Sequence, residues 1–168
     1  MTEHIRYAGG KSSLGDFLAA VSDQGLVAFE FDTTPDALRM RFPEAVVEAD
    51  PGGLSDVVEA LGRVVDDPSH DPGIKLDPRG SDYQKRVWAM LRDIPAGETT
   101  YYGALAAKLG TRDAREVTEA IGSNAIAILV PCHRVLKKDG SISGYRWGVR
   151  RKRALLEREV LCRNMARS

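Results

Sequence analysis

The stretch Ile126–Leu136, IAILVPCHRVL, carries a reactive pair of residues at the end of an apolar run. The run leads to Pro131, and Cys132 and His133 then follow side by side. Its length and composition predict a buried strand. A thiol attacks only as the thiolate, and a neighbouring imidazole can supply that form. Cys132 is therefore a candidate nucleophile, although a buried Cys more often only fills space in a core.

The adjacency of Cys132 and His133 limits how they can work together. Neighbouring residues of an extended chain point to opposite sides, so the two side chains meet only if the chain bends or a water links them. A catalytic imidazole is usually oriented by a third group, most often a carboxylate. Glu157 and Glu159, near the C-terminus, are the candidates for that role.

The composition is typical of a soluble globular protein, with 43% apolar and 29% charged residues among 168. No apolar stretch reaches membrane-spanning length and the N-terminus lacks a signal peptide's apolar core, so we expect a cytoplasmic protein without a membrane partner. The two cysteines, Cys132 and Cys162, show no framework of paired spacings, and both should be free thiols. We interpret Cys162 as a spectator. His and Cys do not cluster at zinc-binding spacing, so we expect no metal.

The net charge is zero, but the charges are spread unevenly along the chain. Residues 30–72 are rich in Asp and Glu, whereas residues 134–158 are rich in Lys and Arg. The basic segment permits an anionic partner on the C-terminal half, and a solvated basic helix face explains it equally well.

The patterning predicts an α+β chain of two domains. Residues 1–77 combine strands, at IRYAG and GLVAFEFD, with helices, the first of which has Thr34 as N-cap. The polar stretch DDPSHDPG is the joint between the domains. Residues 78–168 are expected to be mainly helical, beginning with the amphipathic segment SDYQKRVWAMLRDI and ending with the helix VRRKRALLEREV.

Two short helices in the second half suggest a helix-turn-helix. The first is expected to have Thr99 or Thr100 as its cap and to stop at Gly110, and the second covers TRDAREVTEAIGSN. The pattern alone is weak, because many helical hairpins that bind nothing share it.

Several motifs together resemble those of a known family. IPAGETTYYGALAAKLG, SNAIAILVPCHRV, GSISGYRWG and KRALLERE are similar to segments of the O6-alkylguanine-DNA alkyltransferases, also called methylated-DNA–protein-cysteine methyltransferases. The resemblance covers almost the whole chain. It implies a small ribonuclease-like domain over residues 1–77, with an antiparallel sheet and helices. It also implies a helical DNA-binding and alkyl-transfer domain over residues 78–168, with a winged-helix-like helix-turn-helix.

The resemblance assigns the chemistry to four residues. Cys132 matches the cysteine that takes the methyl group of O6-methylguanine, and of O4-methylthymine, and keeps it, in a single turnover without a cofactor. His133 matches the water-linked base and Glu159 the carboxylate that orients it. Asn124 matches the residue whose amide holds the turn near the active site.

The resemblance also implies how the base is reached and bound. The family rotates the nucleotide out of double-stranded DNA, and Arg115 matches the arginine that fills the gap. Tyr102 matches the tyrosine that faces the guanine and the flanking phosphate. The resemblance assigns guanine binding to the backbone of Val135, to Tyr145 and to Lys152. We also expect Arg134 to contact DNA, and the protein to act as a monomer.

The sequence departs from the family's pattern in two places. Glu116 and Glu119 stand in the second short helix, where small residues are usual, and a carboxylate facing DNA would weaken binding. Arg146 and Trp147 replace smaller residues after Tyr145, and a bulky Trp147 is expected to disfavour alkyl groups larger than methyl.

Two other functions remain open on the sequence. A damage-sensing DNA-binding module of the same fold would need no reactive cysteine, which this chain keeps. A cysteine hydrolase unrelated to DNA would rest only on the Cys, His and Glu types, and would need an oxyanion hole.

Overall fold

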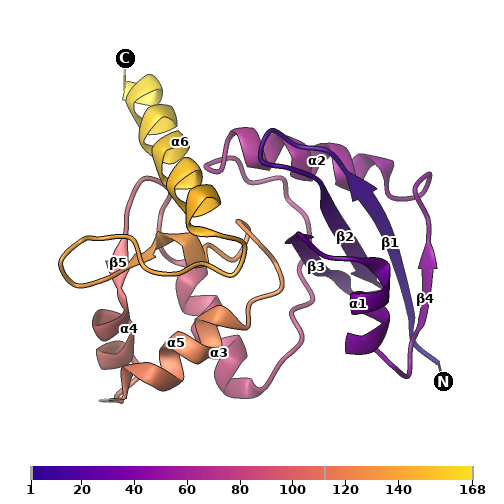
Figure 1. The fold of residues 1–168 in the computed structure, drawn as a ribbon, viewed down its shortest axis with the longest axis horizontal. Helices are drawn as coiled ribbons and strands as arrows, with labels where there is room; N and C mark the ends of the chain where they lie inside the picture. Colours follow the sequence, from indigo (N-terminus) through magenta and orange to yellow (C-terminus); the bar gives the residue numbers. More distant parts are fainter. Residues whose placement is uncertain (1, 112, 168) are drawn as a thin grey trace. The chain divides into compact units, whose positions relative to one another are not determined.

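The chain folds into two compact units (Figure 1). The computed structural model describes the backbone of residues 2–111 and 113–167 and the side chains up to residue 161, so the side chain of Cys162 lies outside the described part. The first unit comprises Met1–Asp66, His70–Arg79 and Ala125–Ala127, and the rest forms the second. Helices and strands are both present, which confirms an α+β chain. No helix in the described part is long and apolar enough to cross a membrane.

A four-stranded sheet in the order β3-β2-β1-β4 organises the first unit. The first three strands pair antiparallel in sequence order, and β4 pairs parallel to β1. The two strands predicted from alternating apolar residues are present as β1 and β3. The strands are β1 (His4–Gly10), β2 (Phe17–Ser22), β3 (Gly25–Phe31) and β4 (Val46–Ala49).

Helix α1 (Pro35–Arg41) covers one face of this sheet. The side chain of Thr34 accepts a hydrogen bond from the Ala37 N–H, which confirms the predicted N-cap. Leu38, the buried residue of α1, packs against apolar side chains of β1 and β2.

Helix α2 (Ser55–Asp66) packs on the other face. Gly10 of β1 faces it so closely that a Cβ at this position would lie 2.7 Å from a methyl carbon of Val58. Ile5, in the cluster with Leu38, is five residues earlier in β1, and side chains alternate along a strand. The sheet is therefore buried from both sides.

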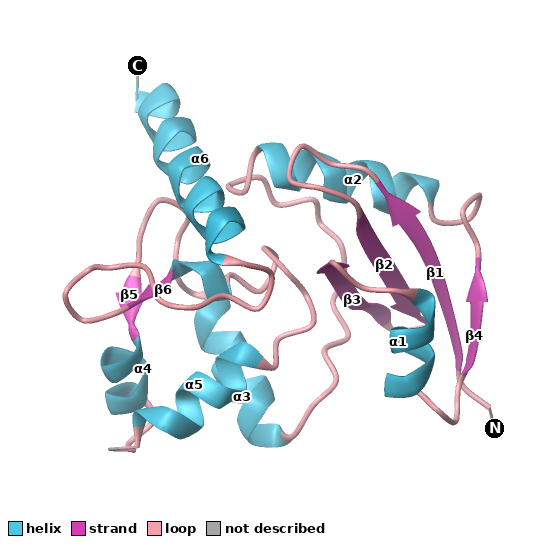
Figure 2. Cartoon of the chain, in the orientation of Figure 1, coloured by secondary structure: helices cyan, strands magenta, loops and turns pink. Residues whose placement is uncertain are grey.

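Helices dominate the second unit (Figure 2). The first of them has a capping box, in which the Ser81 side chain accepts from the Gln84 N–H and the Gln84 side chain accepts from the Ser81 N–H. The predicted pair of short helices is also present. The helices are α3 (Asp82–Arg92), α4 (Tyr102–Lys108), α5 (Ala114–Gly122) and α6 (Val149–Arg167).

The start of α4 differs from the prediction. Thr99 or Thr100 was the expected cap, but the N-cap is Tyr101 and no side chain caps the helix. The reason is a tertiary contact: β5 (Thr100–Tyr101) pairs in parallel with β6 (Val135–Leu136), so the backbone at Thr100 is extended.

The apolar run before Cys132 is not the buried strand that the sequence predicts. Only Ile126 makes a bridge, to Phe29 of β3, and turns follow it. Ile128 has φ +67°, which is uncommon for a β-branched residue and reverses the chain locally. Cys132–Arg134 then form a single 3₁₀ turn, η1. An apolar run of this length indicates that the segment is buried, but it does not distinguish a strand from buried turns.

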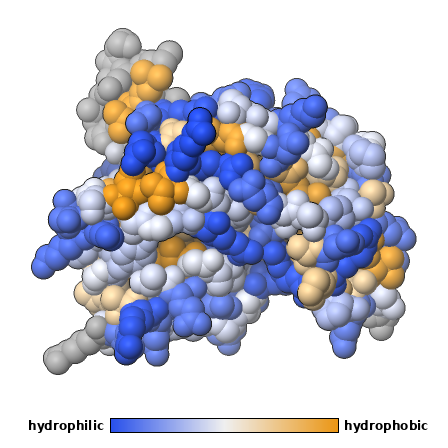
Figure 3. Space-filling view, in the orientation of Figure 1, coloured by the Kyte–Doolittle hydropathy of each residue, from blue (hydrophilic) through white to orange (hydrophobic). Residues whose placement is uncertain are grey.

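The surface has few large apolar side chains. In Figure 3 apolar atoms form small separate patches on the face in view, within a mostly hydrophilic surface. The large apolar side chains that are exposed, among those described, are Met40, Tyr101, Val149, Val160 and Leu161. Polar and catalytic groups in a cavity are therefore a better guide to function than an apolar patch.

Trp88 generates a prediction about the second unit. Its indole N–H donates to the Ala120 carbonyl oxygen at 2.8 Å, which joins α3 to α5 in the interior. Trp88→Phe removes that hydrogen bond, although the carbonyl still accepts from the Ser123 hydroxyl at 2.7 Å, and it also removes buried ring volume, so it should lower the free energy of unfolding by about 2 kcal/mol. Trp147→Phe is the control, because the Trp147 indole is also buried but makes no hydrogen bond with the described residues. Urea denaturation followed by circular dichroism measures both, and equal losses would contradict the prediction.

Candidate active site

A cavity of about 390 Å³ in the second unit contains the Cys132 side chain. Its walls come from α4, from α5, from η1 and from the segment that precedes α6. The cavity is lined by Tyr102, Thr118, Ile121, Gly122, Cys132, Lys137, Ser143, Gly144, Tyr145 and Arg146. Five of these ten positions lie in residues 137–146, a segment without regular structure that is brought back over the thiol.

Asn124 holds the thiol. Its side-chain nitrogen donates to the Val130 carbonyl oxygen at 3.0 Å and to the Cys132 sulfur at 3.4 Å. Both residues are buried. Burial raises the pKa of the Cys132 thiol to about 11, and the Asn124 hydrogen bond and the nearby charge of Lys152 oppose that rise. The resting thiol is therefore protonated at neutral pH and needs a base to react.

His133 and Glu159 form a buried pair. The His133 Nε2 and the Glu159 Oε1 are 2.5 Å apart, and both side chains are fully buried. Burial lowers the pKa of His133, while Glu159 opposes that change. The other ring nitrogen, Nδ1, is buried and has no hydrogen-bond partner among the described residues. An imidazole that is neutral at pH 7, and oriented through Nε2, can accept a proton at Nδ1.

The prediction that Arg134 contacts DNA does not fit its position. Its side chain is 9% exposed, and its Nε and Nη2 donate to Glu159 at 2.8 to 3.2 Å. Its Nη1 also donates to the Ile94 carbonyl oxygen at 2.6 Å. Burial acts to raise the pKa of Glu159, but hydrogen bonds and charges from His133 and Arg134 hold it below its usual value. Arg134 therefore keeps the carboxylate ionised instead of meeting a phosphate.

Lys152 is a fully buried ammonium group close to the thiol. Its Nζ donates to the Val135 carbonyl oxygen at 2.6 Å, to the Ser143 hydroxyl at 3.0 Å and to the Gly144 carbonyl oxygen at 3.4 Å. Burial lowers the pKa of Lys152 to about 8, against the effect of Cys132. At pH 7 the lysine remains charged and favours the thiolate.

Two tyrosines flank the cavity. The Tyr102 hydroxyl is 2.6 Å from the Ser143 hydroxyl, which in turn accepts from Lys152. Tyr145 packs edge to face with Trp147, with ring centroids 5.3 Å apart. Trp147 is buried and does not itself line the cavity, so it acts on the cavity's shape through Tyr145.

Helix α5 presents different side chains on two sides. Thr118, Ile121 and Gly122 line the Cys132 cavity. Glu116 and Glu119 line a separate hollow of about 380 Å³, together with residues of α3. The two carboxylates whose orientation the sequence left open therefore face away from the cavity. Arg115 at the start of α5 has a side chain that is 93% exposed and pairs with Asp113.

Most of the site residues predicted from the sequence lie at the cavity or directly behind it. The structure brings Cys132, Asn124, Tyr102 and Tyr145 together at the cavity, with Lys152 bonded to its wall, and it places His133 and Glu159 directly behind. Val135 is fully buried, and its carbonyl oxygen accepts from Lys152. Sequence reasoning missed Ser143, because a serine in an irregular loop gives no signal of its own, and it noted Arg146 only as a departure from the family's pattern and not as a residue that lines the cavity. Among the described residues, no group of three His, Cys, Asp or Glu side chains could hold a metal ion.

Comparisons with known proteins agree on one family. A family model described as "6-O-methylguanine DNA methyltransferase, DNA binding domain" matches residues 82–161. The chain is 47% identical over 111 residues to the methylated-DNA–protein-cysteine methyltransferase of Mycobacterium tuberculosis H37Rv, which covers 66% of this chain and 67% of that protein. Over 167 residues it is 40% identical to the bifunctional transcriptional activator/DNA repair enzyme Ada of Escherichia coli K12, covering 93% of this chain.

The match to Ada covers only 46% of that protein, so the chain spans about half the length of this relative. A solved structure matches this chain over nearly the full length of both chains. The crystal structure of Mycobacterium tuberculosis OGT in complex with DNA has a TM-score of 0.76 and 36% sequence identity, and covers 94% of this chain and 93% of the other. The chain therefore belongs to the family of methylated-DNA–protein-cysteine methyltransferases.

Proposed function

We propose that this protein repairs DNA by moving the methyl group of O6-methylguanine, and of O4-methylthymine, onto Cys132. The observation that carries this proposal is the buried Cys132 thiol, held by Asn124 at a base-sized cavity with the His133–Glu159 pair behind it. The relatives named above are methyltransferases of this kind. The thioether that forms is stable, so each molecule acts once. The transfer needs no cofactor.

The chemistry is a single displacement. His133 takes the thiol proton through a bridging water, and Glu159 stabilises the imidazolium that results. The sulfur then forms a bond to the methyl carbon while the bond from that carbon to O6 breaks. The electron pair stays with the guanine, which takes up a proton. Lys152 and the Asn124 amide stabilise the thiolate before the attack.

The cavity residues have separate roles in holding the base. Tyr145 forms a wall for the guanine ring, and Tyr102 lies at the side of the cavity where the flanking phosphate would pass. The Val135 carbonyl oxygen uses one lone pair for Lys152 and has a second for the guanine amino group. Lys152 supports this wall through Ser143 and Gly144.

The partner is double-stranded DNA that carries O6-alkylguanine. Helices α4 and α5 act as the helix-turn-helix of a winged-helix-like domain over residues 78–168, and Arg115 enters the stack when the nucleotide is rotated out. Its full exposure at the start of α5 supports this role. Contacts to the backbone in the minor groove make binding largely independent of sequence, as repair of scattered damage requires.

The first unit corresponds to the ribonuclease-like domain, assigned to residues 1–77. We propose a cytoplasmic monomer. A purely damage-sensing role is less well supported, because such a module has no use for a thiol with a dedicated proton acceptor.

The first test is intact mass after mixing the protein with a duplex that carries one O6-methylguanine. We expect a gain of one methyl group per protein, and none in Cys132→Ala. Peptide mapping should place the methyl group on Cys132. No mass gain with the lesion duplex still bound would instead favour the sensing function.

The pH dependence of transfer tests the base. In the wild type the single-turnover rate at saturating duplex should be flat from pH 6.5 to 7.5, because His133 is neutral and Lys152 is charged throughout that range, and it should fall above about pH 8 as Lys152 loses its charge. In His133→Gln the rate should fall about 10²-fold at pH 7, and should rise with pH, since the thiol with a pKa of about 11 must then ionise alone. A flat profile in His133→Gln would remove His133 from the mechanism.

The alkyl range tests the position of Trp147. We expect the wild type to react more slowly with O6-benzylguanine than with O6-methylguanine in DNA, because Trp147 fixes Tyr145 at the cavity wall. Trp147→Ala should raise the ratio of the benzyl to the methyl rate about tenfold. Trp88→Phe, outside the cavity lining, controls for a general loss of stability. Equal rates for both substrates in the wild type would refute the expectation.

A further inference from the structure

We propose that Lys137 binds a phosphate that flanks the extruded nucleotide, at the mouth of the Cys132 cavity. The proposal rests on the proposed function, and it adds a cationic contact to the DNA backbone beside the uncharged Tyr102. Lys137 lines the same cavity as the reactive thiol, together with Tyr102 and Ser143.

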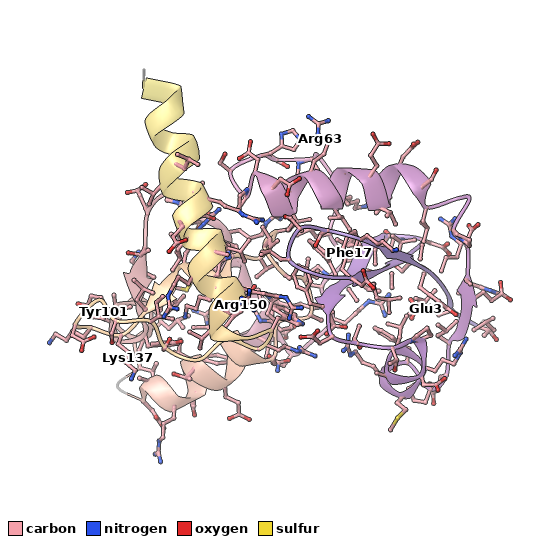
Figure 4. The ribbon with its side chains drawn as sticks, turned by 45° about the horizontal axis from the view of Figure 1, so that its top comes forward. Glu3, Phe17, Arg63, Tyr101, Lys137 and Arg150 are labelled. Carbon is pink, nitrogen blue, oxygen red and sulfur yellow. The ribbon has the colours of Figure 1, made fainter. Side chains whose placement is uncertain are left out.

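The backbone around Lys137 is fixed on both sides. Leu136 pairs with Tyr101 in the two-stranded sheet, so Lys137 follows directly where that sheet ends. The Lys137 N–H donates to the Ser141 carbonyl oxygen, and the Lys137 carbonyl oxygen accepts from the Gly140 N–H. Figure 4 shows Lys137 and Tyr101 near each other on this edge of the second unit. The ammonium is therefore presented from a defined turn.

The other cations near the cavity are already engaged. Lys152 is buried and bonded to the cavity wall. Arg146 lines the cavity, but its Nη1 donates to the carbonyl oxygens of Ser123 and Asn124 at 3.2 and 2.7 Å. Lys137 is exposed, and its ammonium makes no hydrogen bond or ion pair with the described residues. Of the cations that line the cavity, it has the greatest capacity left for an external anion.

One carboxylate lies close enough to compete. Asp139 is in the same turn, and hydrogen bonds from Ser141, with a smaller contribution from the charge of Lys137, lower the pKa of Asp139. The Asp139 Oδ1, however, accepts hydrogen bonds from the Ser141 N–H and hydroxyl groups at 2.9 and 2.6 Å. That carboxylate is therefore occupied in shaping the turn.

The geometry of base extrusion brings phosphate to this place. A guanine that enters the cavity deeply enough to reach Cys132 leaves its sugar and its two flanking phosphates at the rim. A lysine acts on a phosphate as a flexible point charge, and each phosphate that is neutralised contributes about −0.9 to the salt dependence of binding. The ordinary alternative is a solvated lysine in a turn, and Lys138 supplies that reference. It is exposed and adjacent, but it does not line the cavity.

The experiment measures binding to a duplex with one O6-methylguanine in the Cys132→Ala background, so that no transfer consumes the lesion. Lys137→Gln and Lys138→Gln are compared between about 50 and 300 mM salt. This is the range over which phosphate contacts change the affinity enough to be measured. We expect Lys137→Gln to weaken binding about tenfold at low salt and to reduce the magnitude of the log–log slope by about 0.9. Lys138→Gln should change the affinity less than threefold, about the effect of general charge alone.

A neutral methylphosphonate in place of either flanking phosphate identifies the contact. The loss caused by Lys137→Gln should disappear with one of these two duplexes, because the charge that Lys137 binds is then absent. Equal effects of the two glutamine variants, or a Lys137→Gln loss that persists with both neutral duplexes, would overturn the proposal. If these couplings appear while the wild type gains no methyl group, the phosphate contact stands and the proposed repair function fails. If the wild type gains a methyl group but these couplings are absent, the proposed repair function stands and the proposed phosphate contact fails.

Discussion

The buried carboxylate of Glu159 is the group on which the site depends. A carboxylate that is 1% exposed is stable only with compensating partners, and besides the Gly97 N–H at 3.4 Å it has two side-chain partners, the imidazole of His133 and the guanidinium of Arg134. These partners come from η1, whereas Glu159 comes from α6. One interaction therefore anchors the long helix and orients the base. Removing Glu159 would leave a guanidinium buried without its counter-charge, at a cost of about 3–5 kcal/mol.

The electrostatics around Cys132 explain how the protein keeps a nucleophilic side chain unreactive in its resting state. Burial keeps the thiol protonated, so it reacts poorly with electrophiles that happen to diffuse in. Lys152 and Asn124 reduce the cost of the thiolate without making it the resting form. In the proposed mechanism, the sulfur becomes reactive when a substrate occupies the cavity and the proton can pass to His133. If each molecule acts once, as proposed, this restraint preserves the thiol for its substrate.

The sequence was a good guide where local rules decide the structure. Thr34 caps its helix as predicted, and the helical segments and the first strands follow from periodicity. It failed where distant residues intervene. Thr100 could not be seen to pair with Val135, and Ile128 gave no sign of its left-handed backbone. Arg134 was misplaced because arginines are mostly exposed, and burial of one requires a partner such as Glu159 that only the fold supplies.

The path of the chain through its two units has a consequence for dissecting the protein. Ala125–Ala127 belong to the first unit, where Phe29 exchanges hydrogen bonds with Ala125 and Ala127, although the flanking Asn124 and Ile128 belong to the second. A cut after Arg79 would thus leave the C-terminal fragment with three residues whose backbone partners are gone. The same cut would leave the N–H and carbonyl groups of Phe29 in β3 without these partners, while Leu26 keeps its hydrogen bonds to Lys75 and Asp77. The reactive half is therefore not a detachable module.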